Sequence, residues 1–248
     1  MGEALDPRPY AIADRLSGVA RIVGVTGSKG GIGKSVVAST LALAWADRGD
    51  RVGLFDLDFT SPSDHVVLGA DRTFPEEQFG IEPHEVHRIH MMSVAFFAGD
   101  SAVPLRGAAT TNALLELLAI THWGDLDVLI LDMPPGLGDT SLDVINLVTG
   151  LEFLLVGNGS RVVIESVHRA VALLSELGVP LIGLLENMSR TDDGAVAALA
   201  ESFGVDYLGP VPFDPKLEAA LGDVERLRQT SVYRELERLL ADPGLLAG

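Results

Sequence analysis

The sequence predicts an α/β fold: a doubly wound, mainly parallel sheet of about seven strands with helices on both faces. Short apolar runs alternate with helical segments along the chain, and this alternation is typical of parallel sheets with crossover helices. Hydrophobic residues make up 47% of the 248 residues but aromatic residues only 6%, which suits buried strands rich in Val, Leu and Ile.

The individual elements follow from these patterns. We expect strands at Arg21–Thr26, Arg51–Phe55, Arg88–Phe97, Leu126–Leu131, Phe153–Val156, Leu181–Leu185 and Asp206–Leu208. We expect helices at Val36–Trp45, Thr110–Thr121, Leu142–Leu147, Arg161–Leu177, Gly194–Phe203 and Val232–Leu240. No repeat, linker or shift in composition divides the chain. We therefore expect one domain over residues 1–248, with an N-terminal extension at 1–18 and a C-terminal helix and tail at 232–248.

A glycine-rich loop follows the first expected strand, and it holds two of the three lysines in the chain, Lys29 and Lys34. Its glycines allow successive backbone N–H groups to point at phosphate beside a helix N-terminus. Lys34 would reach the β- and γ-phosphates, and the Ser35 hydroxyl would bind Mg²⁺. Ser28 replaces the first glycine of the strict P-loop pattern, but the flanking strand and helix supply the required context. We predict an ATP site comprising Gly30, Gly31, Ile32, Gly33, Lys34, Ser35 and Val36.

Aspartates close two further strands, where the carboxyl ends of a parallel sheet form its binding edge. Asp56 and Asp58 follow one strand, and the alternation of side chains would place both on the same side. One can hold the water shell of Mg²⁺ and the other can orient the attacking water. Asp132 ends another strand in a Walker B arrangement, before a loop that can sense the γ-phosphate. We assign Ser35, Asp56 and Asp132 to magnesium.

Composition excludes several classes of function. The net charge of −17 disfavours binding to nucleic acid or to an anionic membrane. Without cysteine the chain has no disulfide and no thiolate-held zinc or iron–sulfur centre of its own. No apolar run reaches transmembrane length, and Met1–Pro9 does not resemble a signal peptide, so we expect a cytoplasmic protein.

Three histidines, His84, His87 and His90, are evenly spaced before and within the third expected strand. Residues three apart on a strand point to opposite faces, so they cannot converge on one metal ion there. A loop conformation could bring them together. We favour the interpretation in which they bind no metal, because a metal site needs converging ligands.

The chain resembles the Mrp/MinD group of deviant-Walker ATPases from about Arg21 to Phe213. The matching stretches are residues 29–35, Asp56-Leu57-Asp58 with Pro62-Ser63, Pro104-Leu105-Arg106-Gly107, residues 123–127, residues 132–139 and Glu186-Asn187-Met188-Ser189. The resemblance implies a P-loop NTPase fold of the SIMIBI type and a homodimer with ATP at the interface. It also implies that Lys29 reaches the partner's ATP, that Asp58 positions the hydrolytic water, and that Asn187 and Pro212 lie at the adenine. Lys29, Lys34 and Asp58 would then be the catalytic residues.

This chain also departs from the pattern of the iron–sulfur carriers in the group. Those proteins follow the Glu-Asn-Met-Ser stretch with a Cys-x-x-Cys pair, whereas Ser189 is followed here by residues 190–193 without cysteine. Val36 and Leu137 each replace a threonine, and Asn158-Gly159 replaces Thr-Pro. Lys34, Ser35 and Asp132 are retained, so we expect ATP hydrolysis without cluster carriage by thiolates.

A cysteine-free archaeal branch of the same group acts like HypB in nickel insertion during [NiFe]-hydrogenase maturation. Ser63–Gly69, Phe74–Glu77 and His87 resemble this branch more than the carriers. The main hypothesis is therefore an ATP-dependent homodimer that assembles a nickel centre, with a HypA-like nickel and zinc metallochaperone or an apo-metalloprotein client as partner. The first alternative is an Mrp-type iron–sulfur assembly ATPase that lacks its own cluster cysteines.

The second alternative is a positioning ATPase of the MinD or ParA type. A ParA-like protein needs a basic face for DNA, which conflicts with the acidic composition. A MinD-like protein needs a basic amphipathic C-terminal helix, whereas residues 232–241 are balanced in charge. We expect that helix to pack on its own domain, and we expect neither nucleic acid nor membrane as a partner.

Overall fold

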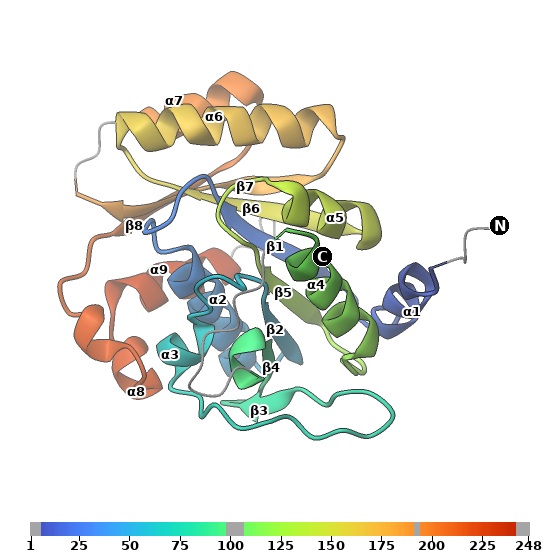
Figure 1. Cartoon of the computed structure of the whole chain (residues 1–248). Helices are drawn as coiled ribbons and strands as arrows, with labels where there is room; N and C mark the ends of the chain where they lie inside the picture. Colours follow the sequence, from blue (N-terminus) through green and yellow to red (C-terminus); the bar gives the residue numbers. More distant parts are fainter. Residues whose placement is uncertain (1–5, 98–106, 191–193, 242–248) are drawn as a thin grey trace.

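The computed structural model describes residues 6–97, 107–190 and 194–241 (Figure 1). Four parts of the sequence interpretation lie outside these ranges. They are residues 1–5 of the N-terminal extension, the family match at Pro104–Arg106, residues 191–193 after Arg190, and the tail at 242–248.

One sheet forms the centre of the molecule, with eight strands in the order β3-β4-β2-β5-β1-β6-β7-β8 (Figure 1). The strands are β1 Ile22–Gly27, β2 Val52–Asp56, β3 His84–Val86, β4 Ile89–Ser93, β5 Val128–Asp132, β6 Leu151–Gly157, β7 Leu181–Ser189 and β8 Tyr207–Pro212. All neighbours pair in parallel except β3 and β4, which form an antiparallel hairpin. The mainly parallel α/β fold is confirmed, with eight strands rather than about seven.

Two expectations near β3 and β4 were wrong. The additional strand is β3, which covers the edge of the sheet with only three residues. The expected strand Arg88–Phe97 is too long, because the chain leaves the sheet after Ser93 and forms the 3-10 turn Val94–Phe96. The Ser93 hydroxyl accepts a hydrogen bond from the N–H of Ala95, and this local bond starts the turn.

The helices connect the strands and cover both faces of the sheet (Figure 1). They are α1 Arg8–Arg15, α2 Lys34–Arg48, α3 Asp64–Leu68, α4 Ala108–Ile120, α5 Asp139–Leu147, α6 Arg161–Glu176, α7 Ala195–Phe203, α8 Val224–Leu227 and α9 Ser231–Leu240. A second 3-10 turn spans Glu218–Ala220. Right-handed crossovers place α2 on one face and α4, α5, α6 and α7 on the other.

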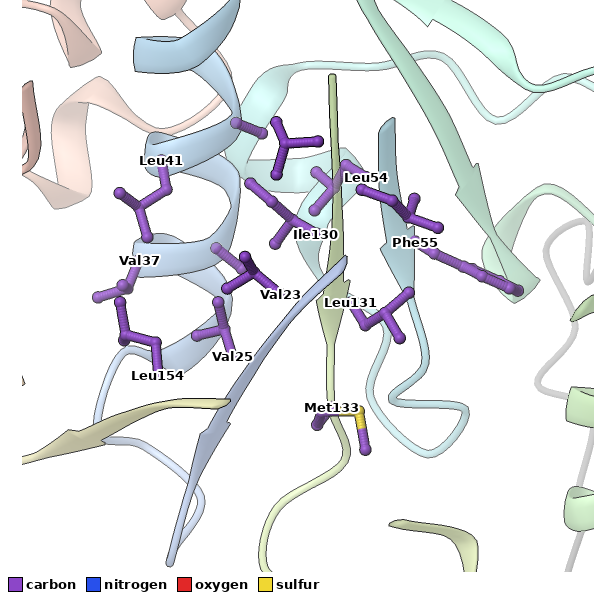
Figure 2. Close-up of a cluster of buried hydrophobic side chains, with 14 of the residues drawn as sticks. Val23, Val25, Val37, Leu41, Leu54, Phe55, Ile130, Leu131, Met133 and Leu154 are labelled. Atoms are coloured by element: carbon purple, nitrogen blue, oxygen red, sulfur yellow. The ribbon is translucent and has the colours of Figure 1, made fainter. Parts of the chain in front are cut away.

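The core lies between α2 and the central strands. Val37 and Leu41 of α2 and Val23 and Val25 of β1 belong to the cluster of buried side chains drawn in Figure 2, and all four are fully buried. Strands β1, β2 and β5 are buried along their whole length. Such burial on both faces explains why these strands appear in the sequence as nearly continuous apolar runs.

The two terminal helices pack on other helices of the domain, α1 against α4 and α9 against α2. Ile12 of α1 is fully buried, and the Arg15 guanidinium donates to the carbonyl of Ala119 at the end of α4. Helix α9 packs against α2 as expected, with Leu236 fully buried. Asp47 of α2 joins this contact by accepting hydrogen bonds from the Tyr233 hydroxyl and from Arg228. Among the described helices, none has the length and apolar character needed to cross a bilayer.

Candidate nucleotide and cation site

The glycine-rich loop connects β1 to α2 and opens toward solvent. Lys29, Gly30 and Gly31 are exposed, whereas Ile32 is buried beneath the loop. Gly33 precedes the first turn of α2 with φ of +78°, in the left-handed region that glycine adopts without strain. No side chain caps this turn, so the N–H groups of a 15-residue helix remain available to an anion.

Asn187 holds the loop from behind. Its side chain is buried, and Nδ2 donates a 2.8 Å hydrogen bond to the carbonyl oxygen of Ile32. A Cβ atom on Gly33 would lie 2.4 Å from Asn187 Nδ2, so only glycine fits beside this contact. The geometry gives Asn187 a role in shaping the loop, which the sequence alone did not suggest.

Lys34 and Asp132 form a buried ion pair at the carboxyl end of β5. The Lys34 ammonium lies 2.5 Å from Asp132 Oδ1, and the two side chains are 7% and 0% exposed. The Lys34 ammonium also donates a 3.4 Å hydrogen bond to the Ser35 hydroxyl, and burial raises the pKa of Asp132 against the lowering effects of Lys34 and Ser35. Three of the expected site residues, Lys34, Ser35 and Asp132, are therefore in direct contact.

Asp56 and Asp58 do not share the strand geometry that we expected. Strand β2 ends at Asp56, so the alternation of side chains does not continue to Asp58. Asp56 is fully buried and accepts hydrogen bonds from the N–H groups of Asp58 and Ser63. Asp58 Oδ1 accepts from the N–H and the hydroxyl of Thr60. Asp56 therefore ends the strand, and Asp58 lies in the loop that follows it.

A third buried carboxylate, Asp64, was missed by sequence reasoning. It is the first residue of α3, is 0% exposed, and accepts a 2.8 Å hydrogen bond from the Ser39 hydroxyl of α2. One carboxylate oxygen from each of Asp56, Asp64 and Asp132 lies within 4.8 Å of the others. The only sequence signal for Asp64 was its place directly after Pro62-Ser63. Whether its carboxylate reaches the site depends on how α3 folds back toward α2.

The environment of this carboxylate cluster opposes its full ionisation. Burial and the nearby Asp132 charge raise the pKa of Asp56 to about 7. Burial, with Asp132 and Asp56 close by, raises the pKa of Asp64 well above its usual value. Oδ2 of Asp132 is buried and has no hydrogen-bond partner among the described residues. An unpartnered buried oxygen beside a hydroxyl and further carboxylates fits Mg²⁺, which prefers oxygen ligands.

The loop after β5 contacts the base of the glycine-rich loop. The N–H of Gly136 donates a 2.8 Å hydrogen bond to the carbonyl oxygen of Gly27, and the Ser141 hydroxyl donates to the carbonyl oxygen of Gly136. The Pro134-Pro135-Gly136 segment is therefore linked to the end of β1. Ser141 belongs to α5, so the same segment is also linked to that helix.

A hollow of about 330 Å³ lies at the carboxyl ends of β6, β7 and β8. Its lining includes Asn158, Glu186, Arg190 and Phe213, and the Arg190 guanidinium stacks 3.9 Å above the centre of the Phe213 ring. Pro212 is exposed at the end of β8 and does not line this hollow. Neither residue expected beside adenine lines this hollow. Asn187 contacts the glycine-rich loop at Ile32, and Pro212 is only the neighbour in sequence of Phe213, which does line it.

The three evenly spaced histidines do not converge. His84 contacts the carbonyl oxygen of Thr73, and His87 contacts the carbonyl oxygen of Leu68 from a turn with φ of +51°. His90 is exposed and pairs with Glu85 across the β3–β4 hairpin. In the described part of the chain, the grouping suited to a metal ion consists of aspartates alone.

Strand, glycine-rich loop, helix N-terminus and buried strand-end aspartates together define a P-loop nucleotide-binding protein. A model of the family described as ParA, "NUBPL iron-transfer P-loop NTPase", matches residues 18–241, and the chain belongs to this family of ATPases. It is similar to a nucleotide-binding protein from Archaeoglobus fulgidus in complex with ADP. The identity is 26% and the TM-score 0.74, over 89% of this chain and 93% of that one.

Two curated relatives are iron–sulfur cluster carrier proteins. The chain is 37% identical to an iron–sulfur cluster carrier protein of Saccharolobus solfataricus over 215 residues, 80% of this chain and 73% of the relative. It is 32% identical to an iron–sulfur cluster carrier protein of Aquifex aeolicus over 226 residues. That match covers 85% of this chain but 62% of the Aquifex protein, so the chain spans less than two thirds of that relative.

Proposed function

We propose that the chain is a Mg²⁺- and ATP-dependent dimeric switch that acts in iron–sulfur cluster assembly without carrying a thiolate-bound cluster of its own. The match to the iron-transfer P-loop NTPase family over residues 18–241 is the observation that carries this proposal. The intact Lys34, Ser35 and Asp132 contacts support the ATPase part. The absence of cysteine from the sequence limits the role in assembly to one without thiolate ligands.

Nucleotide binding would exchange the partners of Lys34. In the structure Lys34 pairs with Asp132, and on binding ATP its ammonium would move to the β- and γ-phosphate oxygens beside the α2 N-terminus. Gly30–Val36 would then surround the phosphates. Ser35 and Asp132 would hold Mg²⁺, with Asp56 accepting hydrogen bonds from its water shell, and the ion would neutralise phosphate charge. Asp58 would orient the attacking water.

Lys29 would complete the site of a partner subunit. Its position on the exposed part of the loop supports this role, because a side chain that crosses an interface cannot be held within its own core. ATP would thus bring two copies of the chain face to face, and hydrolysis would separate them. The hollow near Phe213 and Arg190 would accept the base, with Asn187 and Pro212 at its borders.

Nickel insertion of the HypB type ranks second among the candidate functions. Its support is the sequence resemblance at Ser63–Gly69, Phe74–Glu77 and His87. The family description and the curated relatives concern iron transfer and iron–sulfur proteins instead, and they give nickel insertion no support. Under that hypothesis the partner would be a HypA-like chaperone, and under the proposed function it would be an apo-iron–sulfur client.

A deletion strain of the native host separates the two metals. We expect iron–sulfur enzymes to lose activity in the strain and to regain it with the wild-type gene, but not with a Lys34→Ala gene. Nickel enzymes should retain their metal content, measured by mass spectrometry of the purified proteins. A selective loss of nickel from hydrogenase, with normal iron–sulfur enzymes, would replace the proposed function with nickel insertion.

A further inference from the structure

Asp64 is a third carboxylate beside Asp56 and Asp132, the two that the proposed function assigns to magnesium. It lies on α3, eight residues after Asp56, and is 0% exposed. The Ser39 hydroxyl of α2 donates to its Oδ1, so α2 helps to hold the carboxylate in place. Its oxygen lies within 4.8 Å of oxygens from Asp56 and Asp132.

Two oxygens of this cluster have no hydrogen-bond partner among the residues that the structure describes. They are Asp64 Oδ2 and Asp132 Oδ2, and both are shielded from solvent. A buried carboxylate oxygen without a donor is costly, because the desolvation of the charge is not repaid. The free oxygens therefore point to a ligand that accepts lone pairs in this pocket.

Charge balance indicates the kind of ligand. Three buried carboxylates face the ammonium of Lys34, which the Asp132 pair already engages. A dication would allow all three carboxylates to ionise together, because it adds two positive charges to the one that Lys34 supplies. Two oxygens bonded to one ion at about 2.1–2.5 Å can lie at most about 4.2–5.0 Å apart, and the oxygens of this cluster lie within 4.8 Å of one another.

We propose that Asp56, Asp64 and Asp132 form a divalent-cation site that fills before nucleotide binds, with Asp64 as an additional ligand. The proposal rests on the magnesium assignments of the proposed function and extends them to the nucleotide-free protein.

Direct titration with Mn²⁺ tests the site without nucleotide or turnover. The free Mn²⁺ signal in electron paramagnetic resonance reports binding to wild-type protein, and we expect one ion per chain. Asp64→Asn keeps the size of the side chain and removes its charge, and it should weaken Mn²⁺ binding at least about tenfold, because ligand charge sets cation affinity. Asp71→Asn removes one charge from an exposed position nearby and should bind like wild type.

Asp64→Ala gives a second loss of the same carboxylate and should also weaken Mn²⁺ binding. Equal binding by wild type and either Asp64 variant overturns the proposal. So does a wild-type protein that binds no Mn²⁺ without nucleotide, a result that needs no variant. The Mn²⁺ titration contains no ATP, so its result does not depend on the proposed function. A failure of ATP hydrolysis or of iron–sulfur assembly would contradict the proposed function without changing the result of the titration.

Discussion

Gly33 offers a quantitative test of the glycine-rich loop. Its φ of +78° is unfavourable for alanine, which costs about 1–2 kcal/mol. A Cβ atom there would also lie 2.4 Å from Asn187 Nδ2 and displace the hydrogen bond to Ile32, at a further cost of about 1 kcal/mol. Gly33→Ala should therefore lower the free energy of unfolding by about 2–3 kcal/mol.

Two neighbouring glycines separate these contributions. Gly31 has φ of +80° but no atom within 4 Å of an added Cβ, so Gly31→Ala should show the backbone strain alone, about 1–2 kcal/mol. Gly30 has neither a positive φ nor a close contact, so Gly30→Ala should change stability by no more than about 1 kcal/mol. Differential scanning calorimetry of all three variants without nucleotide is the assay. For a chain of this size, each 1 kcal/mol corresponds to a shift in Tm of about 2–4 °C.

The order of the three variants decides the outcome. The loop geometry predicts the largest loss for Gly33→Ala, an intermediate loss for Gly31→Ala and the smallest for Gly30→Ala. If Gly33→Ala melts at the same temperature as Gly31→Ala, the contact between the loop and Asn187 is absent in solution.

Three further predictions concern the C-terminal helices, the P-loop lysines and the cluster chemistry. Burial alone would raise the pKa of Asp47, but hydrogen bonds from Arg228 and Tyr233 outweigh it and lower the pKa. Asp47→Asn should therefore cost about 1–2 kcal/mol at neutral pH in chemical denaturation, and this difference should shrink as the pH falls below about 4. Lys34→Ala should weaken ATP binding itself, whereas Lys29→Ala should bind ATP as a monomer and fail to hydrolyse it, as measured by calorimetry and phosphate release. Anaerobic reconstitution with iron and sulfide should leave no stoichiometric cluster absorbance on the purified chain, because it has no cysteine.

Each of these predictions has a contrary result. A difference between Asp47→Asn and wild type that stays constant down to pH 3 would show that the ionised carboxylate is not the stabilising species. Full activity and an ATP-dependent dimer in Lys29→Ala would reduce Lys29 to a loop residue. A stable cluster after reconstitution would require ligands other than thiolates.

The meeting of Lys34 with the strand-end aspartates could be predicted from the sequence because its signals are local. The lysine-bearing loop, its flanking strand and helix, and Asp132 at the end of an apolar run each occupy a few consecutive residues. Adjacent parallel strands then bring their carboxyl ends together, as the register of Asp56 opposite Asp132 shows. Local sequence patterns, together with the rule that adjacent parallel strands bring their carboxyl ends together, were therefore sufficient to predict that these residues meet.

The missed features depend on contacts between distant residues. Asp64 reaches the site because the five-residue helix α3 turns back toward Ser39 of α2, 25 positions earlier. Asp58 does not lie on the strand as expected, because β2 ends two residues before it. Strand β3 is only three residues long, and its pairing with β4 depends on a tight turn at His87 and Arg88, both with positive φ. Periodicity has no signal for elements this short.

The central claim, an ATP-driven dimeric switch, is tested most directly by the oligomeric state of Asp58→Ala. Removing the carboxylate that would orient water should stop hydrolysis and leave the phosphate contacts of the loop in place. Light scattering after size exclusion should then find a stable dimer with Mg²⁺-ATP and a monomer with ADP. A variant that remains monomeric with saturating Mg²⁺-ATP, or that hydrolyses ATP at the wild-type rate, would contradict the account.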